Sequence, residues 1–258
     1  MAHNSMPRFA GALLVVALLT AALLVAAGCS SVPELGEATA EDTYDFGVAA
    51  AERGDYTLAI EIFKRITLDT PLHETADDAL VALADAHRAI SDYASAEEAY
   101  RRLLSDYPRS TLVPEAEYKL GMTFFDQVLP TALDQSMTEQ AISQFEYFLA
   151  AFPSSGFVDE AAERVLELRT RLAAKRYDSA TLYFSLRQPK AARVYLESVI
   201  VEYPDTVWAR AALLDKARSF AAEGARALAE GEYERLMELY PETEEARTAA
   251  TEKAALSG

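Results

Sequence analysis

Cysteine and histidine are scarce in this chain of 258 residues, which has one cysteine, Cys29, and three histidines. A single thiol cannot form an internal disulfide, and neither His73 nor His87 has a second histidine or cysteine at metal-ligand spacing. The sequence also lacks a glycine-rich phosphate loop and a Gly-x-Ser-x-Gly elbow. We therefore predict no metal, no cofactor and no enzymatic activity.

Basic residues are also few, with 24 Lys and Arg against 41 Asp and Glu, which gives a formal net charge of −17. Such a surface repels phosphate backbones, so we predict no nucleic-acid partner. Glycine and proline number ten each. Because these residues interrupt regular structure, their low content favours helices joined by short connections.

The longest apolar run covers residues 9–28 and ends at Cys29. The first 28 residues contain no Asp or Glu and one basic residue, Arg8. A basic start followed by an apolar segment is the layout of a secretory signal. Residues 25–29, Val-Ala-Ala-Gly-Cys, resemble the bacterial lipobox, whose cysteine is acylated. We predict a lipoprotein signal peptide at residues 1–28.

Cys29 is the predicted lipidation site, carrying palmitate or similar chains, and residues 29–40 are the lipidated tether. Two acyl chains anchor a protein stably, whereas one gives marginal binding. Ser30 follows the cysteine, and the resemblance to lipoproteins of double-membraned bacteria implies anchoring to the outer membrane with the body in the periplasm. The alternative is an uncleaved membrane anchor, because about 20 apolar residues can cross a bilayer.

Five prolines mark an internal repeat, and the residue before four of them is aromatic. An alanine stands twelve residues before each proline, and a bulky residue follows each alanine by four positions. The prolines are Pro71, Pro108, Pro153, Pro204 and Pro241, and the alanines are Ala59, Ala96, Ala141, Ala192 and Ala229. This register resembles the second helix of a tetratricopeptide repeat (TPR), with the proline ending the helix.

Small residues mark the first helix of each pair, where they let two antiparallel helices approach closely. They are Gly47, Ala84, Gly121, Ala180 and Ala217. We predict an all-α fold, a TPR-type α-α superhelix (solenoid) of about five helix pairs plus an extra helix and a C-terminal cap.

The intervals between the prolines are 37, 45, 51 and 37 residues, against the usual 34 for this repeat. The 45-residue interval exceeds the usual repeat length, and we assign its extra residues to a longer loop around residues 128–137. We assign the extra residues of the 51-residue interval to an additional helix, from Asp159 to about Arg171. The first helix of repeat four would follow it at roughly 175–185. Residues 41–155 then hold TPR-like repeats 1–3. Residues 156–258 hold the extra helix, repeats 4–5 and the cap.

Two binding surfaces follow from this arrangement. The first helices of TPR arrays line the concave side, which predicts an apolar groove with one cation for an extended hydrophobic peptide, whose carboxylate would pair with Arg88. The groove residues are Glu41, Tyr44, Val48, Val81, Asp85, Arg88, Tyr118, Met122 and Phe125. The alternative is that half of them pack between repeats.

The second surface is a basic segment with only two acidic residues, Glu167 and Asp178. Its eight basic residues are Arg164, Arg169, Arg171, Lys175, Arg176, Arg187, Lys190 and Arg193. As a group they form a partner-docking patch for an acidic surface, where complementary charge steers encounter. The alternative for each of them is an ordinary solvated face.

Several of these features together resemble the BamD family, lipoproteins of the outer-membrane β-barrel assembly machinery. They are the lipobox, the five units, and the segments Leu182-Tyr183, Ala191-Ala192 and Tyr203-Pro204-Asp205-Thr206. The resemblance implies a scaffold that binds the periplasmic domains of the barrel-forming subunit through its C-terminal repeats. Other assembly lipoproteins and unfolded outer-membrane proteins are the further partners it implies. Tyr195 stands where the family commonly has arginine, so a contact made by that arginine is not expected here.

Two other functions fit parts of the sequence. One is a TPR lipoprotein of another envelope machine, such as a pilotin or a cell-division coordinator. The other is a peptidoglycan hydrolase, which would need a catalytic domain for which the repeats leave no room.

Overall fold

The computed structural model describes residues 39–256, which form eleven helices. They are α2 (Ala40–Glu52), α3 (Tyr56–Asp69), α4 (Ala76–Ala89), α5 (Tyr93–Asp106), α6 (Val113–Phe125), α7 (Ser136–Ala151), α8 (Val158–Ser185), α9 (Pro189–Glu202), α10 (Val207–Ala222), α11 (Arg226–Leu239) and α12 (Glu244–Leu256). The predicted all-α class is confirmed. Cys29 and the predicted signal peptide lie outside the described residues.

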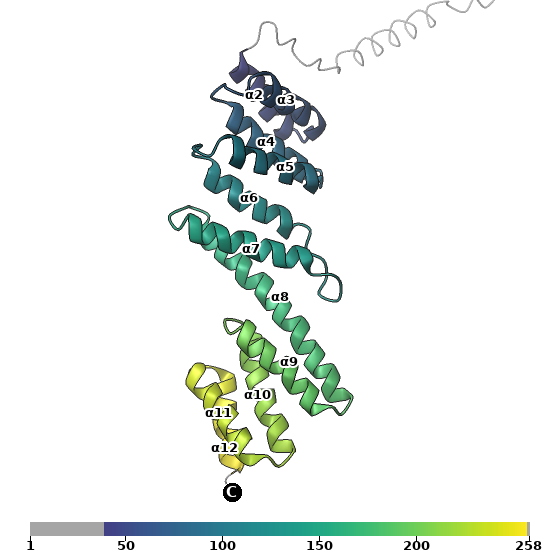
Figure 1. Ribbon diagram of the computed structural model, residues 1–258, viewed down its shortest axis with the longest axis vertical. Coiled ribbons are helices and arrows are strands. Elements are labelled where there is room, and N and C mark those ends of the chain that lie inside the picture. Colours follow the sequence, from purple (N-terminus) through teal and green to yellow (C-terminus); the bar gives the residue numbers. More distant parts are fainter. Residues whose placement is uncertain (1–38, 257–258) are drawn as a thin grey trace, which may run out of the picture.

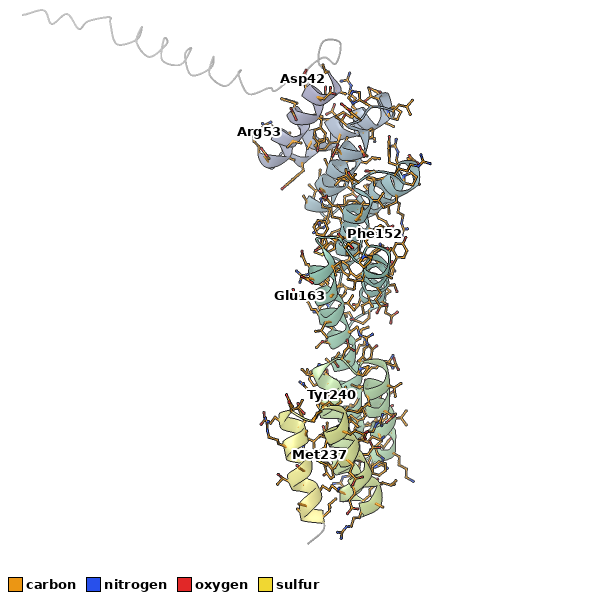
Figure 2. The ribbon with its side chains drawn as sticks, turned by 90° about the vertical axis from the view of Figure 1, so that its left-hand side faces the viewer. Asp42, Arg53, Phe152, Glu163, Met237 and Tyr240 are labelled. Carbon is orange, nitrogen blue, oxygen red and sulfur yellow. The ribbon has the colours of Figure 1, made fainter. Side chains whose placement is uncertain are left out.

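The helices stack in chain order into an elongated array, with each one packed against its neighbours in sequence (Figure 1). A quarter turn shows the same long stack, with Asp42 near one end and Met237 near the other (Figure 2). One continuous cluster of buried side chains runs from Ala50 to Ala249. None of the helices within residues 39–256 has both the length and the hydropathy needed to cross a membrane.

Close contact between small and aromatic residues holds the pairs together, as predicted. A Cβ atom on Gly121 in α6 would lie 2.6 Å from Cε1 of Phe145 in α7. The same atom on Gly47 would lie 2.6 Å from Cε1 of Phe63. The ring therefore occupies the space that a larger side chain would need, which sets the distance between the two helices.

Four of the five turns between paired helices have one left-handed residue, five positions before the repeat alanine. It is Gly54 (φ 79°), Ser91 (φ 62°), Arg187 (φ 58°) or Gly224 (φ 76°). Glycine adopts this conformation without a Cβ penalty, whereas serine and arginine do not. Repeats two and four therefore carry strain that repeats one and five avoid.

The tyrosine before a repeat proline ties one corner of the array to the next. Tyr107 Oη donates to the carbonyl of Pro71 at 2.5 Å, and Tyr240 Oη donates to the carbonyl of Pro204 at 2.7 Å. Both bonds span 36 residues and occur across the two 37-residue intervals. The aromatic-proline pattern thus has a structural cause beyond ending a helix.

Replacing Tyr240 with phenylalanine should lower the free energy of unfolding by about 0.5–1.5 kcal/mol, because the ring stays and one hydrogen bond is lost. Tyr147→Phe is the control, since Tyr147 is exposed and its hydroxyl has no hydrogen bond within the described chain. Urea denaturation followed by circular dichroism compares the two. Equal midpoints would argue against a stabilising corner bond.

The long loop predicted between the helices of repeat three is present between α6 and α7. Two side chains from α8 hold it: Arg171 Nη2 donates to the carbonyl of Leu129 and Lys175 Nζ donates to the carbonyl of Leu133, both at 2.8 Å. Arg171 and Lys175, two cations of the predicted patch, therefore stabilise this loop through hydrogen bonds to its carbonyl groups.

The extra helical residues are also present, but the predicted break before residue 175 is wrong. Helix α8 runs without interruption from Val158 to Ser185, 28 residues, or about 42 Å. No glycine or proline occurs in this stretch, so nothing in it stops the backbone hydrogen bonds. The first half of α8 packs on α7 and the second half on α9 and α10, so one helix joins the two halves of the array (Figure 1).

Candidate binding surfaces

The predicted N-terminal groove is built from α2, α4 and α6. Four of its members, Tyr44, Val48, Met122 and Phe125, are partly exposed side chains that also pack against the core. Glu41, also predicted for the groove, is exposed at the start of α2. These residues keep apolar surface available to a ligand.

Two other predicted groove residues pack between helices. Val81 is 7% exposed and Tyr118 is 5% exposed. The Tyr118 ring stacks on Phe157 with centroids 4.7 Å apart and planes 9° apart. Burial, followed by the hydrogen bond to Glu160, raises the pKa of Tyr118. Both residues therefore offer little surface to a peptide, as the alternative interpretation expected.

Asp85 belongs to an internal polar network. It accepts a hydrogen bond from Tyr100 Oη at 2.5 Å and one from Lys119 Nζ at 2.6 Å. Lys119 also lies 2.7 Å from Glu115. Burial and the Asp85 charge raise the pKa of Tyr100. Asp85 thus joins α4, α5 and α6.

Arg88, the predicted anchor for a carboxylate, already has one. Its Nε donates to Asp126 Oδ2 at 2.5 Å, across 38 residues. Burial lowers the pKa of Arg88, but the hydrogen bond and charge of Asp126 outweigh it, so the net shift is upward. A peptide carboxylate would have to displace Asp126.

Most of the basic patch is engaged within the array. Arg169 makes paired hydrogen bonds to Asp205 and donates to the carbonyl of Glu202 at 2.9 Å. The hydrogen bond from Arg169 lowers the pKa of Asp205. Arg176 lies 2.8 Å from Glu202, and both guanidinium groups cover the ring of Tyr203. These two arginines fix the corner between α9 and α10.

Two further patch residues also have partners. Arg164 pairs with Glu167 at 3.1 Å and lies 5.0 Å from the centroid of Phe125. Arg193 donates to Ser219 at 2.7 Å and pairs with Glu223 at 3.0 Å. Such pairs leave little net positive charge for an external ligand.

Arg187 and Lys190 differ from the rest of the patch. Both side chains are exposed, Arg187 in the turn between α8 and α9 and Lys190 in the first turn of α9, and neither side chain has a hydrogen bond or ion pair within residues 39–256. Three apolar side chains near them in sequence are each more than half exposed: Leu182 in the last turn of α8, Leu186 at the C-cap of α8, and Val194, one helical turn after Lys190 on α9. We call Leu182, Leu186, Arg187, Lys190 and Val194 the turn patch.

The three apolar members of the turn patch were not predicted from the sequence. A search for large apolar residues at solvent-facing helix positions next to unpaired basic residues would have found them. Tyr195, at the position where arginine was expected from the family resemblance, stacks on Tyr183 with centroids 5.1 Å apart. The side-chain hydrogen bond that Tyr183 makes to Tyr195 raises the pKa of Tyr183.

The paired helices, their small-aromatic contacts and their aromatic-proline corners define a tetratricopeptide-type repeat protein. Residues 36–236 match the YfiO family, described as outer membrane lipoproteins. This match covers most of the chain, and the chain belongs to that family.

Relatives named as BamD proteins agree with this assignment. The outer membrane protein assembly factor BamD of Caulobacter vibrioides is 26% identical over 198 residues, which cover 74% of this chain and 65% of that protein. BamD of Haemophilus influenzae is 26% identical over 203 residues, covering 74% and 77%. The TPR2AB domain of yeast Sti1, solved in complex with pHSP90, aligns over 84% of this chain and 83% of its own with TM-score 0.48 and 15% identity.

Proposed function

We propose that this protein is a non-enzymatic scaffold of the outer-membrane β-barrel assembly machinery, anchored by lipid on Cys29 at the periplasmic face. Its turn patch binds a periplasmic domain of the barrel-forming subunit. Its N-terminal groove receives extended segments of unfolded outer-membrane proteins. Family membership and relatives named as assembly factors support the role.

The observation that carries the docking site is the pair of unengaged cations, Arg187 and Lys190, in a chain of net charge −17. Arg187 also occupies a left-handed position that repeats one and five fill with glycine. A residue held in an unfavourable backbone conformation is consistent with a functional constraint. Flanking leucines would supply apolar contact around a charge pair with an acidic partner.

Replacing Arg187 with glycine should raise the free energy of unfolding by up to about 1 kcal/mol, because backbone strain is relieved. The same change should weaken binding to the periplasmic domains of the barrel-forming subunit by roughly tenfold, equivalent to about 1.4 kcal/mol. Calorimetric titration measures the binding, and the loss should shrink at higher salt.

Ser91→Gly is the matched control, because Ser91 occupies the same left-handed position in repeat two. It should stabilise the fold equally and leave binding unchanged. Undiminished binding by Arg187→Gly would refute the proposed site. Recovery of a secretin instead of the barrel-forming subunit in a pull-down would favour the pilotin alternative.

Replacing Cys29 with serine should abolish metabolic palmitate incorporation and release the protein from the membrane fraction, because the acyl chains would have no thiol to attach to. Cys29 is the only cysteine, so no other thiol can substitute. Undiminished labelling of the variant would rule out lipidation at this residue.

The groove is tested from Met122, a partly exposed member on α6. A photocrosslinker at this position should capture unfolded outer-membrane proteins in cells. The same probe at Glu238 on the exposed side of α11 serves as the control. Capture of the same proteins from both positions would argue against a groove-specific contact.

A further inference from the structure

The corner between α3 and α4 differs from the other repeat corners in having a fully exposed apolar residue directly after the repeat proline. Leu72 follows the first repeat proline and is 100% exposed, and Leu68, one helical turn earlier, is 59% exposed. The residues that follow the other four repeat prolines are polar: Arg109, Ser154, Asp205 and Glu242. Single exposed leucines are common on proteins, so the location of this one decides its meaning.

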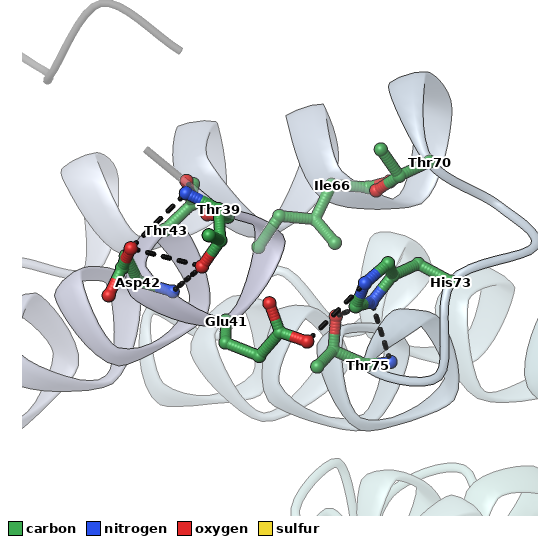
Figure 3. Close-up of polar contacts among 8 residues, drawn as sticks. All are labelled: Thr39, Glu41, Asp42, Thr43, Ile66, Thr70, His73 and Thr75. Atoms are coloured by element: carbon green, nitrogen blue, oxygen red, sulfur yellow. Dashed lines mark hydrogen bonds and ion pairs between the residues drawn. The ribbon is translucent and has the colours of Figure 1, made fainter. Parts of the chain in front are cut away.

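This corner lies beside the first described residues of the chain. His73 Nε2, next to Leu72, is 3.4 Å from Glu41 Oε1 in the first turn of α2 (Figure 3). Thr39, the N-cap of α2, stands ten positions after Cys29. A random-coil chain of ten residues has a root-mean-square span of roughly 17–19 Å. A membrane that holds Cys29 is therefore within reach of the corner.

The corner is also held rigidly. The His73 amide donates to the carbonyl of Thr70 at 3.0 Å, and His73 Nδ1 lies 3.1 Å from Thr75 Oγ1. From the next repeat, Tyr107 Oη binds the carbonyl of Pro71 at 2.5 Å. A turn that is already ordered loses less conformational entropy when its side chain inserts into a bilayer.

We propose that Leu72, supported by Leu68, inserts into the lipid bilayer that carries the acyl chains of Cys29 and forms a second, shallow membrane contact. The inference rests on the proposed lipidation. Acidic residues surround the corner: Glu74 is exposed, and Asp69 lies 3.5 Å from Arg65. Repulsion of anionic headgroups by these charges makes zwitterionic lipid the preferred surface.

The test couples the mature chain, through the Cys29 thiol, to a maleimide lipid in phosphatidylcholine vesicles with brominated acyl chains. Trp208, the single tryptophan, is first replaced by phenylalanine. Leu72→Trp is then compared with Arg109→Trp and Glu242→Trp, which place the same ring after other repeat prolines. These controls account for the affinity of tryptophan itself for the interface.

We expect roughly a twofold loss of emission from the Leu72→Trp variant, little loss from the two controls, and less quenching when phosphatidylglycerol is added. Equal quenching in all three variants, or none in Leu72→Trp, would overturn the proposal. The proposal would also be overturned if the Leu72→Trp emission stayed unchanged on vesicles but shifted when the barrel-forming subunit was added. That result would show that Leu72 contacts a protein. Chemical coupling replaces cellular lipidation in this experiment. A negative quenching result would therefore refute insertion of Leu72 without refuting lipidation of Cys29, which the palmitate experiment tests.

Discussion

Gly121→Ala should lower the free energy of unfolding by about 1–3 kcal/mol, the usual cost of overpacking a filled core. The new Cβ would lie 2.6 and 2.7 Å from two atoms of the Phe145 ring. That ring is completely buried and 5.9 Å from Tyr118, so it has little room to move. Separation of α6 from α7 is the expected response. Urea denaturation followed by circular dichroism provides the measurement.

Gly231→Ala is the control for this prediction. Gly231 also lies inside a helix, α11, but no atom comes within 4 Å of its added Cβ. Alanine has the higher helix propensity, so this variant should gain up to about 1 kcal/mol. Opposite signs for the two variants support the close-packing argument. A stabilised Gly121→Ala variant would contradict it.

Lys216→Met should lower the free energy of unfolding by about 1.5–3 kcal/mol, because it removes the more buried of two cations from a partly buried ionic cluster. Lys216 Nζ lies 2.6 Å from Glu197 Oε2 and 2.5 Å from Glu232 Oε1. The side chains of Lys216 and Glu232 are 13% and 16% exposed. The variant would leave two carboxylates on α9 and α11 with Arg235 Nη1, 3.5 Å from Glu197 Oε1 and 3.6 Å from Glu232 Oε2, as their remaining counter-charge.

The destabilisation should depend on pH. Burial raises the pKa of Glu197, but the hydrogen bond and charge of Lys216 outweigh it, so the pKa is below its ordinary value. A lowered pKa in the folded state stabilises the protein at neutral pH, and this stabilisation is lost as pH falls below about 4.3. The difference between Lys216→Met and the parent should therefore be largest at neutral pH and shrink in acid.

Arg65→Met is the control for the ionic cluster, because the Arg65 to Asp69 pair is exposed and one helical turn apart. Such pairs contribute less than about 1 kcal/mol. A loss of similar size in both variants would show that burial of Lys216 is not the cause.

Much of the fold is predictable from sequence because its repeat signals are local. Proline position, the small residue at Gly121 and its bulky partner Phe145 report steric requirements within one helix pair. The continuity of α8 is harder to predict from repeat spacing alone, since a long interval fits either two helices or one. The lack of glycine or proline in residues 158–185 is the better guide.

The candidate surfaces are less predictable, since charge partners come from neighbouring repeats. Arg88 and Asp126 are 38 residues apart, and Arg169 and Asp205 are 36 apart. Both spacings are close to the repeat interval, because stacking places equivalent positions side by side. Opposite charges one repeat apart therefore form a usable sequence signal, and applying it would have separated Lys190 from Arg169.

Helix α8 fixes the separation between the two candidate surfaces. Arg164 near its start lies over Phe125 of the groove, and Leu186, its C-cap, belongs to the turn patch. Shortening the distance between them would require breaking backbone hydrogen bonds in an uninterrupted helix. If the proposed function holds, a client bound at the groove and a partner bound at the turn patch would be separated by a spacer of constant length, and only movement of the client or the partner would bring them together.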